Sequence, residues 1–176
     1  LWVIYDSAHC FGVKFKGRSL LSYGDLSTCS FHATKVFHTV EGGAIISNHP
    51  ELHEKLQLLR AFGHRGDEDY KFVGINGKNS EFHAAMGLCN LPHVPAIIEA
   101  RKAVFEVYDA TLDWNHLRKP LINPDIEYNY AYYPVVFESE VAMRRVQAAL
   151  GEEQIVPRRY FYPSLNTLPF MPRSYA

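Results

Sequence analysis

Cysteine is scarce in this sequence of 176 residues, which contains only Cys10, Cys29 and Cys89. Their odd number and the lack of a CxxC pair argue against a disulfide framework and suit a reducing cytosol. The sequence also lacks a strong net charge, since its formal net charge is -1. This small charge argues against nucleic acid or an anionic membrane as the main partner. No apolar run approaches the length that crosses a membrane. We therefore expect a cytoplasmic protein with no nucleic-acid partner and no membrane partner.

The sequence also lacks the charged start and the small-residue cleavage site of a secretory signal peptide. It begins with Leu1 inside an apolar run and ends at residues 171–176 without a closing element. With 47% hydrophobic residues, it can bury the core of one domain, or of one domain and part of another. We expect the middle and later part of a longer enzyme.

Apolar residues occupy consecutive positions in the first segment, Leu1–Tyr5, as in a strand that is covered on both faces in a parallel sheet. Asp6 follows directly, at the carboxyl end of the strand, where sites in open α/β sheets gather. Lys14–Arg18 is typical of a hairpin turn. Further strands are expected at residues 26–31, 44–47, 130–137 (an edge strand interrupted by Pro134) and 155–162.

Two helices are expected in the first half of the sequence. Asn48 is predicted to cap the first, which ends at Gly63. Ser80 or Asn79 is predicted to cap the second. Its inward face is expected to contain four residues, namely Phe82, Ala85, Met86 and Cys89.

Two more helices follow, and the residue composition of the sequence changes after residue 115. Apolar residues at helical spacing predict a long helix from about Pro95 to Leu112. Ser139 is predicted to cap a fourth helix, which runs to Leu150 and stops at Gly151. Strand, helix and strand in this aromatic region predict a smaller α+β domain.

The nine histidines raise the question of a metal site. His49 and His53 have the i,i+4 spacing that places two imidazoles on one helix face. No glutamate or third ligand accompanies them as in an HExxH motif, so we expect no metal site. No serine lies in a GxSxG elbow, although a Ser-His-Asp triad stays open.

Lys35 is surrounded in sequence by apolar and hydroxyl residues instead of other charges, within the run Ser30–Val40. Partial desolvation would disfavour its charged form and lower its pKa. A neutral amine attacks carbonyl carbon, so Schiff-base chemistry is one interpretation. The other is a lysine whose stem extends along apolar surface from the end of a strand.

Three further polar residues accompany Lys35 at the ends of the first two strands. Asp6 follows the first strand, His9 stands three residues later, and Ser30 precedes the lysine segment. A carboxylate can hold a pyridine nitrogen protonated, a lysine can form a Schiff base, and a serine hydroxyl can donate to a phosphate. The set is what binding of pyridoxal 5'-phosphate (PLP) requires.

Several segments carry a resemblance to a known family: Tyr5–His9, Phe11-Gly12, Gly24–Leu26, Ser30–Lys35, Glu41–Ala44, and Gly74–Asn76 continuing through Glu81 to Ala85. Over nearly its whole length the sequence resembles the DegT/StrS-type sugar aminotransferases of PLP fold type I. The segment around Lys35 is the most specific of these matches.

The resemblance implies a role for each of five residues. It places Asp6 at the pyridine nitrogen of PLP, His9 near its phenolic oxygen, Ser30 at its phosphate, and Lys35 as the catalytic Schiff-base residue. It also implies that Asn76 reaches the phosphate bound by a neighbouring subunit. The implied partner is therefore a second copy of the chain, in a homodimer with shared active sites.

The resemblance also implies the fold class and the domains. We expect α/β architecture, with residues 1–103 as the C-terminal half of a large cofactor-binding domain that has a mostly parallel sheet. Residues 104–176 would form a linker helix and a small α+β C-terminal domain. The family's N-terminal portion is absent, so the chain as given cannot make a complete site.

Within the family, the segments Gly74–Lys78 and Arg158–Pro163 look most like enzymes that aminate dTDP-4-keto-6-deoxyglucose. The implied reaction moves an amino group from glutamate to a nucleotide-linked 4-keto-6-deoxysugar. Two departures concern the sugar-nucleotide contacts: Lys78 stands where many relatives carry arginine, and Pro157 precedes the arginine pair.

Two alternatives to an aminotransferase remain open at the level of the sequence. A sugar dehydratase on the same scaffold replaces the lysine with histidine. Lys35 argues against a dehydratase, although His32 and His38 are near in sequence. The other alternative is a non-catalytic regulatory or structural homologue that does not bind PLP.

Overall fold

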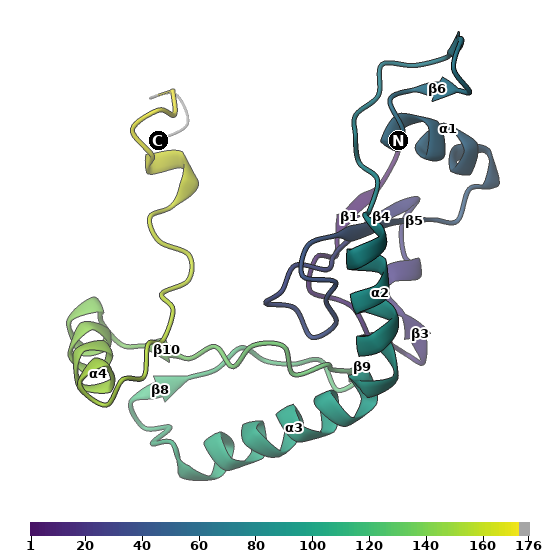
Figure 1. Cartoon of the computed structure of the whole chain (residues 1–176). Helices are drawn as coiled ribbons and strands as arrows, with labels where there is room; N and C mark the ends of the chain where they lie inside the picture. Colours follow the sequence, from purple (N-terminus) through teal and green to yellow (C-terminus); the bar gives the residue numbers. More distant parts are fainter. Residues whose placement is uncertain (173–176) are drawn as a thin grey trace. The chain divides into compact units, whose positions relative to one another are not determined.

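The computed structural model describes residues 1–172, which form two compact units (Figure 1). The first unit contains residues 1–112 and 120–134, and the second contains residues 113–119 and the chain from Val135 onward. The expectation for the last four residues, 173–176, lies outside the described residues. The predicted division at residue 103 concerns the domains of a longer enzyme and stays a prediction.

A three-stranded sheet forms the centre of the first unit, in the order β1-β4-β5. β1 (Ile4–Asp6) pairs in parallel with β4 (Leu26–Ser30), which pairs antiparallel with β5 (Gly43–Ser47). The described part of this sheet therefore has one parallel and one antiparallel pair, and the mostly parallel sheet expected for the large domain stays a prediction. β5 begins at the same end of the sheet at which β4 finishes, so these two strands run in opposite directions. A parallel partner would need a connection that crosses to the other end of the sheet.

Short antiparallel ladders complete the first unit. β2 (Lys14–Phe15) and β3 (Arg18–Ser19) form the predicted hairpin. β9 (Ile126–Glu127) pairs with β2, and Lys14 Nζ lies 2.8 Å from Glu127 Oε2. This ladder ties residues 120–134 to the start of the chain. β6 (His64–Arg65) pairs with β7 (Asp69–Tyr70).

Three helices belong to the first unit, and Figure 1 shows the second continuing into the third. They are α1 (Pro50–Arg60), α2 (Glu81–Asn90) and α3 (Val94–Thr111), with 3₁₀ turns at Leu20–Ser22 and Leu91–His93. The Ser80 cap is confirmed, because its side chain accepts a hydrogen bond from His83 N. The Asn48 cap is wrong: His49 is the N-cap of α1, and Asn48 Nδ2 instead donates to the carbonyls of Ser22 and Gly24.

The inward face predicted for α2 is also wrong for the described chain. Phe82 is 88% exposed, and Ala85, Met86 and Cys89 are exposed as well. The buried position is Gly87, where an added Cβ would lie 2.8 Å from Thr39 Cγ2. A glycine allows α2 to approach the loop after β4 closely, so the contact is made by the smallest residue.

The second unit contains β8 (Leu117–Arg118), paired antiparallel with β10 (Val136–Phe137), then α4 (Glu140–Glu152) and a 3₁₀ turn at Leu165–Thr167. The Ser139 cap is confirmed, since its Oγ accepts from Ala142 N at 3.2 Å. α4 runs past the predicted stop at Gly151.

Two predicted strands differ from the structure. Of residues 130–137, only Val136–Phe137 form a strand. Residues 155–162 form no strand, and the apolar side chains of Ile155, Val156 and Phe161 are exposed. Apolar β-prone residues are not sufficient for a strand, because a ladder also needs a backbone partner.

The core of the described chain is small and lies around the loop after β4. Its buried apolar residues are Val13, Cys29, Val36, Phe37 and Val94, and its buried polar residues are Ser7, Ser27, Thr39 and Asn129. β1 is exposed along its length, so the predicted cover on both of its faces is not formed by the described residues. Within residues 1–172, no helix is both long enough and apolar enough to span a membrane.

Candidate active site

The loop between β4 and β5, residues 31–42, carries Lys35 and is closed by its own backbone. Phe31 N donates to Gly42 O, and Thr39 N donates to Phe31 O, both at 2.9 Å. Lys35 N donates to His32 O at 2.9 Å, so the lysine follows a tight turn. These bonds give Lys35 a fixed place relative to the ends of β4 and β5.

Three phenylalanine rings pack behind this loop. Phe11 stacks on Phe37 with ring centroids 4.4 Å apart, and Phe31 meets Phe37 edge-on at 4.9 Å. Val36 and Phe37 are buried, whereas Lys35 is half-buried. Aromatic contacts of this geometry add to the stabilisation from burial. The two residues after Lys35 therefore anchor the loop, and Lys35 itself faces a pocket.

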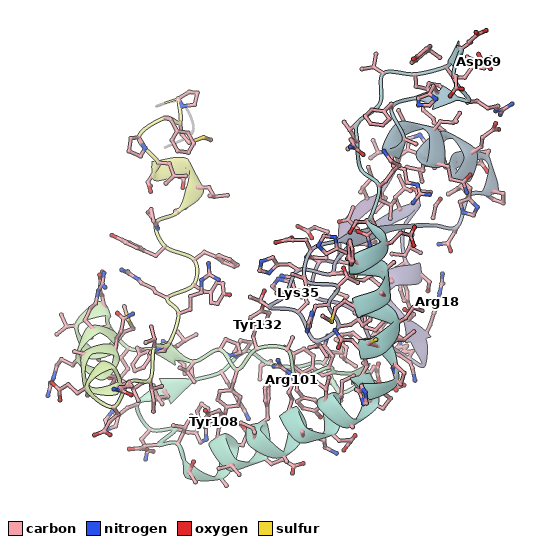
Figure 2. The ribbon with its side chains drawn as sticks, viewed as in Figure 1. Arg18, Lys35, Asp69, Arg101, Tyr108 and Tyr132 are labelled. Atoms are coloured by element: carbon pink, nitrogen blue, oxygen red, sulfur yellow. The ribbon has the colours of Figure 1, made fainter. Side chains whose placement is uncertain are left out.

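The pocket brings together parts of the chain that are far apart in the sequence. Figure 2 labels Lys35 and Tyr132, which both line it. The full lining consists of Ala8, His9, Phe11, Ser30, Lys35, Val36, Asn129, Ala131 and Tyr132. Three of the predicted site residues, His9, Ser30 and Lys35, thus share one pocket.

Asp6 lies beside the pocket at the end of β1. Its Oδ1 accepts a hydrogen bond from Ala8 N at 3.1 Å, which orients the carboxylate at the turn that leads to His9. Burial lowers the pKa of His9, the positive charge of Lys35 lowers it further, and the negative charge of Asp6 opposes both effects. Asp6 and Lys35 therefore both act electrostatically on His9.

Ser30 is the last residue of β4 and lines the pocket, and its hydroxyl oxygen already accepts one hydrogen bond. Its Oγ accepts from His32 N at 3.3 Å. A hydroxyl has one hydrogen to donate besides its acceptor lone pairs. Ser30 can therefore donate to an anionic group in the pocket while it supports the turn that precedes Lys35.

Asn76 is not among the described residues that line the pocket. It lies against the end of α1, where it forms a β-bridge with Ala61, and its Oδ1 accepts from Lys78 Nζ at 2.6 Å. Lys78 Nζ also lies 4.0 Å from the centre of the Phe62 ring. The role of Asn76 toward a neighbouring subunit stays a prediction.

The family model described as the DegT/DnrJ/EryC1/StrS aminotransferase family matches residues 1–176. The chain belongs to this family. It is 40% identical over 166 residues to dTDP-4-amino-4,6-dideoxy-D-glucose transaminase from Shigella dysenteriae. That match covers 93% of this chain but 45% of the relative, so the chain spans less than half of the relative's length.

Two solved structures show the same fold. The chain superposes on DesI, crystallised in the presence of its TDP-sugar product, with a TM-score of 0.85 and 29% identity, covering 96% of this chain and 44% of DesI. It also superposes on the PLP form of Spr1654 from Streptococcus pneumoniae, with a TM-score of 0.79 and 25% identity, covering 88% and 42% of the two chains. The α/β fold is therefore that of sugar aminotransferases.

The residues of this family member fit the cofactor that the family implies. PLP presents a ring nitrogen, a phenolic oxygen, a phosphate and an aldehyde, and the site offers a carboxylate, an imidazole, a hydroxyl hydrogen and an amine. Asp6 stands at a strand end, and His9, Ser30 and Lys35 line one pocket. The donor set at this edge of the sheet matches the groups of PLP.

Two residues of the pocket, Asn129 and Tyr132, were not predicted from the sequence. Asn129 Nδ2 donates to His9 O at 2.9 Å and to Phe11 O at 2.8 Å. The ring of Tyr132 lies 4.8 Å from that of His9. Tyr132 falls in residues 130–137, which were expected to be only an aromatic edge strand, and Asn129 directly precedes them. A lone asparagine among tyrosines was the one available signal.

The other histidines considered in the sequence are held by hydrogen bonds and ion pairs. His49 Nε2 donates to Asp25 Oδ1 at 2.8 Å, and His53 Nε2 lies 3.1 Å from Ser47 O. Within residues 1–172, no group of three or more His, Cys, Asp or Glu side chains is placed to hold a metal ion.

The arginine pair of the subgroup motif lies in the second unit. Arg159 stacks its guanidinium 3.4 Å from the centre of the Tyr162 ring and pairs with Glu140 at 3.1 Å. Arg158 lies 5.3 Å from the centre of the Tyr160 ring. Contact of this pair with a sugar nucleotide stays a prediction.

Proposed function

We propose that the full-length protein is a PLP-dependent aminotransferase that moves an amino group from glutamate to the keto carbon of a nucleotide-linked 4-keto-6-deoxysugar. The observation that carries the proposal is the shared pocket of His9, Ser30 and Lys35, with Asp6 at the adjoining strand end. Family membership supplies the class of reaction, and the pocket supplies the groups that it needs.

Four residues would hold the cofactor. Asp6 would bind the ring nitrogen, His9 the phenolic oxygen, Ser30 the phosphate and Lys35 the aldehyde carbon. When bound, PLP supplies an aldehyde that condenses with amines and a ring that withdraws electrons from the substrate carbon. The negative charge of Asp6 would keep the ring nitrogen protonated, which favours that withdrawal.

Lys35 would act as both base and acid in the two half-reactions. In each half-reaction its Nζ would move one proton between the substrate carbon, which is Cα of glutamate in the first and C4 of the sugar in the second, and the C4′ position of the cofactor. The backbone bond from Lys35 N to His32 O and the buried neighbours Val36 and Phe37 keep the stem of the lysine in place. A single amine at a fixed position can serve both substrates in turn.

The choice of substrate is supported by two relatives. The Shigella relative, at 40% identity, is named for dTDP-4-amino-4,6-dideoxy-D-glucose, and DesI was crystallised with its TDP-sugar product. Both names concern a sugar linked to thymidine diphosphate, and the Shigella name specifies a 4-amino-4,6-dideoxy sugar. We therefore propose dTDP-4-keto-6-deoxyglucose as the acceptor and glutamate as the donor, with the protein acting as a cytoplasmic homodimer whose Asn76 serves the neighbouring site.

The pocket favours an aminotransferase over a dehydratase. A dehydratase on this scaffold carries histidine in place of the lysine, and here Lys35 lines the pocket. His32 lies 2.9 Å from Thr34 Oγ1 and 3.6 Å from Glu41 Oε1, and the carbonyl of His38 accepts from Asn90 Nδ2. Neither of these two histidines is among the described residues that line the pocket.

The test is product analysis with the full-length protein, PLP, glutamate and dTDP-4-keto-6-deoxyglucose. We expect 2-oxoglutarate and the 4-amino sugar nucleotide in equal amounts. Lys35→Ala should lose turnover, while Lys71→Ala, which removes a surface lysine paired with Asp69, should retain it. A deoxygenated keto sugar without 2-oxoglutarate would indicate a dehydratase, and failure to bind PLP would indicate a non-catalytic homologue.

A further inference from the structure

Asn129 is the most completely buried large polar residue of the described chain that touches the pocket, with 1% of its surface exposed. Both polar atoms of its amide are hydrogen-bonded. Nδ2 donates to His9 O at 2.9 Å and to Phe11 O at 2.8 Å, and Oδ1 accepts from Ala131 N at 3.2 Å. An amide has two donor hydrogens, so no donor is left over.

The segment that carries Asn129 is fixed from its other side. Tyr130 has φ of 52°, a left-handed conformation that non-glycine residues seldom adopt. Arg101 of α3, labelled in Figure 2, donates from Nη1 to Ala131 O at 3.1 Å and to Tyr130 O at 3.5 Å. The long helix therefore supports the turn that presents Asn129 to the His9 segment.

Gly12 makes this contact between the two segments close. It has φ of 80°, and an added Cβ would lie 3.1 Å from Ile98 Cδ1 and 4.0 Å from Asn129 Cβ. A Cβ at this position would crowd Ile98 of α3, whereas it would make only an ordinary contact with Asn129. The turn at residues 9–12 is thus packed directly against both α3 and Asn129.

The ring of His9 is positioned by a second residue of the same segment. Tyr132 lies with its ring 4.8 Å from the His9 ring at an interplanar angle of 35°. Both rings line the pocket with Lys35. The backbone of His9 is thus held by Asn129, and its imidazole is flanked by Tyr132.

We propose that Asn129 is a positioning residue that, together with Tyr132, sets the place of the His9 imidazole in the Lys35 pocket. Asn129 touches neither substrate nor reacting atoms in this account and acts through His9. The inference deepens the proposed function and rests on it, because His9 is assigned to PLP only there. A residue that merely joined two loops would affect stability without changing how His9 titrates.

The experiment uses the full-length protein without cofactor and follows the His9 ring by NMR over a pH series, with His9→Gln identifying its signal. Asn129→Ser removes both donors to the His9 turn, while a serine hydroxyl can still accept from Ala131 N. The matched control is Asn48→Ser, because Asn48 Nδ2 also donates to two carbonyls but lies at the start of α1.

The groups that face His9 set the expected direction. Burial and the charge of Lys35 lower its pKa, and Asp6 opposes them. Loosening the turn in Asn129→Ser should raise the pKa of His9 toward the ordinary value of about 6.5 and weaken PLP binding about tenfold or more. Asn48→Ser should change neither quantity.

An unchanged His9 titration in folded Asn129→Ser would overturn the proposal. If that variant does not fold, Tyr132→Leu decides the question: a raised His9 pKa supports the proposal and an unchanged one overturns it. The titration is measured without cofactor, so it is informative even if the wild-type protein fails to bind PLP. That failure would contradict the proposed function and not the positioning role.

Discussion

At the scale of single residues, Asp25 connects two segments of the first unit through one carboxylate. Its Oδ2 accepts from Val3 N at 2.7 Å, and its Oδ1 accepts from His49 Nε2 at 2.8 Å. The hydrogen bond from Val3, followed by that from His49, lowers the pKa of Asp25. The bond to Asp25, with a further contribution from Glu51, raises the pKa of His49.

These two shifts predict how stability depends on pH. A raised histidine pKa contributes stability that is fully present below the unfolded value of about 6.5 and is lost as pH rises through the folded value. A lowered aspartate pKa contributes stability above its unfolded value of about 3.9, and that stability is lost as pH falls through the folded value. The pair therefore stabilises most between about pH 4 and pH 6.5.

The measurement is the urea midpoint of the full-length protein at about pH 5.5 and about pH 9. His49→Gln should lose stability relative to wild type at the lower pH and lose less at the higher pH. His53→Gln is the control, because His53 bonds a carbonyl and no carboxylate. An equal deficit of His49→Gln at both pH values would rule out the ion pair as a source of pH dependence.

Asp6→Asn tests the electrostatic role proposed for that carboxylate. An asparagine Oδ1 can still accept from Ala8 N, so the turn should persist. Loss of the charge should reduce the rate of the glutamate half-reaction on the order of 10²-fold while PLP still binds. Rapid-mixing spectroscopy measures the rate, with Asp69→Asn on β7 as a control. A wild-type rate in Asp6→Asn would refute the assignment to the ring nitrogen.

The residues of the pocket differ in how far the sequence could reveal them. Asp6 and Ser30 lie at the ends of recognisable strands, and Lys35 stands in an unusual local run, so they were predicted from nearby residues and a family resemblance. Asn129 bonds carbonyls 118 and 120 residues away. No local pattern encodes a contact of that range, because it depends on β9 joining β2.

At the scale of elements, the contact between α2 and the lysine loop depends on a glycine. An added Cβ at Gly87 would lie 2.8 Å from Thr39 Cγ2 and 3.5 Å from Phe37 Cζ. Thr39 is buried and its Oγ1 donates to Glu41 O, so it has little freedom to move. Crowding at this position acts directly on the loop that carries Lys35.

Two glycine substitutions in helices should therefore have opposite effects. Gly87→Ala gains about 1 kcal/mol of helix propensity but costs about 1–3 kcal/mol in overpacking, so it should destabilise. Gly151→Ala in α4 meets nothing within 4 Å and should stabilise by about 0.5–1 kcal/mol. Urea unfolding measures both. A stabilising Gly87→Ala would show that α2 does not press on the lysine loop.

Elements were predictable where their signals are local. The caps at Ser80 and Ser139 were correct because a cap bonds a backbone group three residues away. The inward face of α2 was wrong because burial depends on which element lies opposite, and in the described chain Gly87 is the buried residue of this helix. The strand expected at residues 155–162 was wrong because an apolar run does not supply its own pairing partner.

At the scale of the whole molecule, the chain covers 45% of the Shigella relative, and the proposed site is shared between two subunits. Asn76 lies outside the Lys35 pocket in the described chain, as a residue that serves another subunit would. A hydrogen bond to a charged group is worth about 1.5–3 kcal/mol. Asn76→Ala should therefore weaken PLP binding by roughly one to two orders of magnitude.

Subunit exchange tests the shared site. Lys35→Ala and Asn76→Ala should each have little activity as full-length homodimers at limiting PLP. A mixture that exchanges subunits should recover activity, because one of the two sites in a heterodimer regains both residues. If heterodimers form and the mixture stays inactive, Asn76 does not serve the neighbouring site.

The central claim is that Lys35 is the residue that joins PLP, and borohydride reduction tests it most directly. The full-length protein is incubated with PLP, reduced, digested and mapped by mass spectrometry. The account predicts a pyridoxyl phosphate group on the peptide that contains Lys35, and no such group on that peptide in Lys35→Ala. A label on a different lysine, or no label on a folded protein at saturating PLP, would contradict the account.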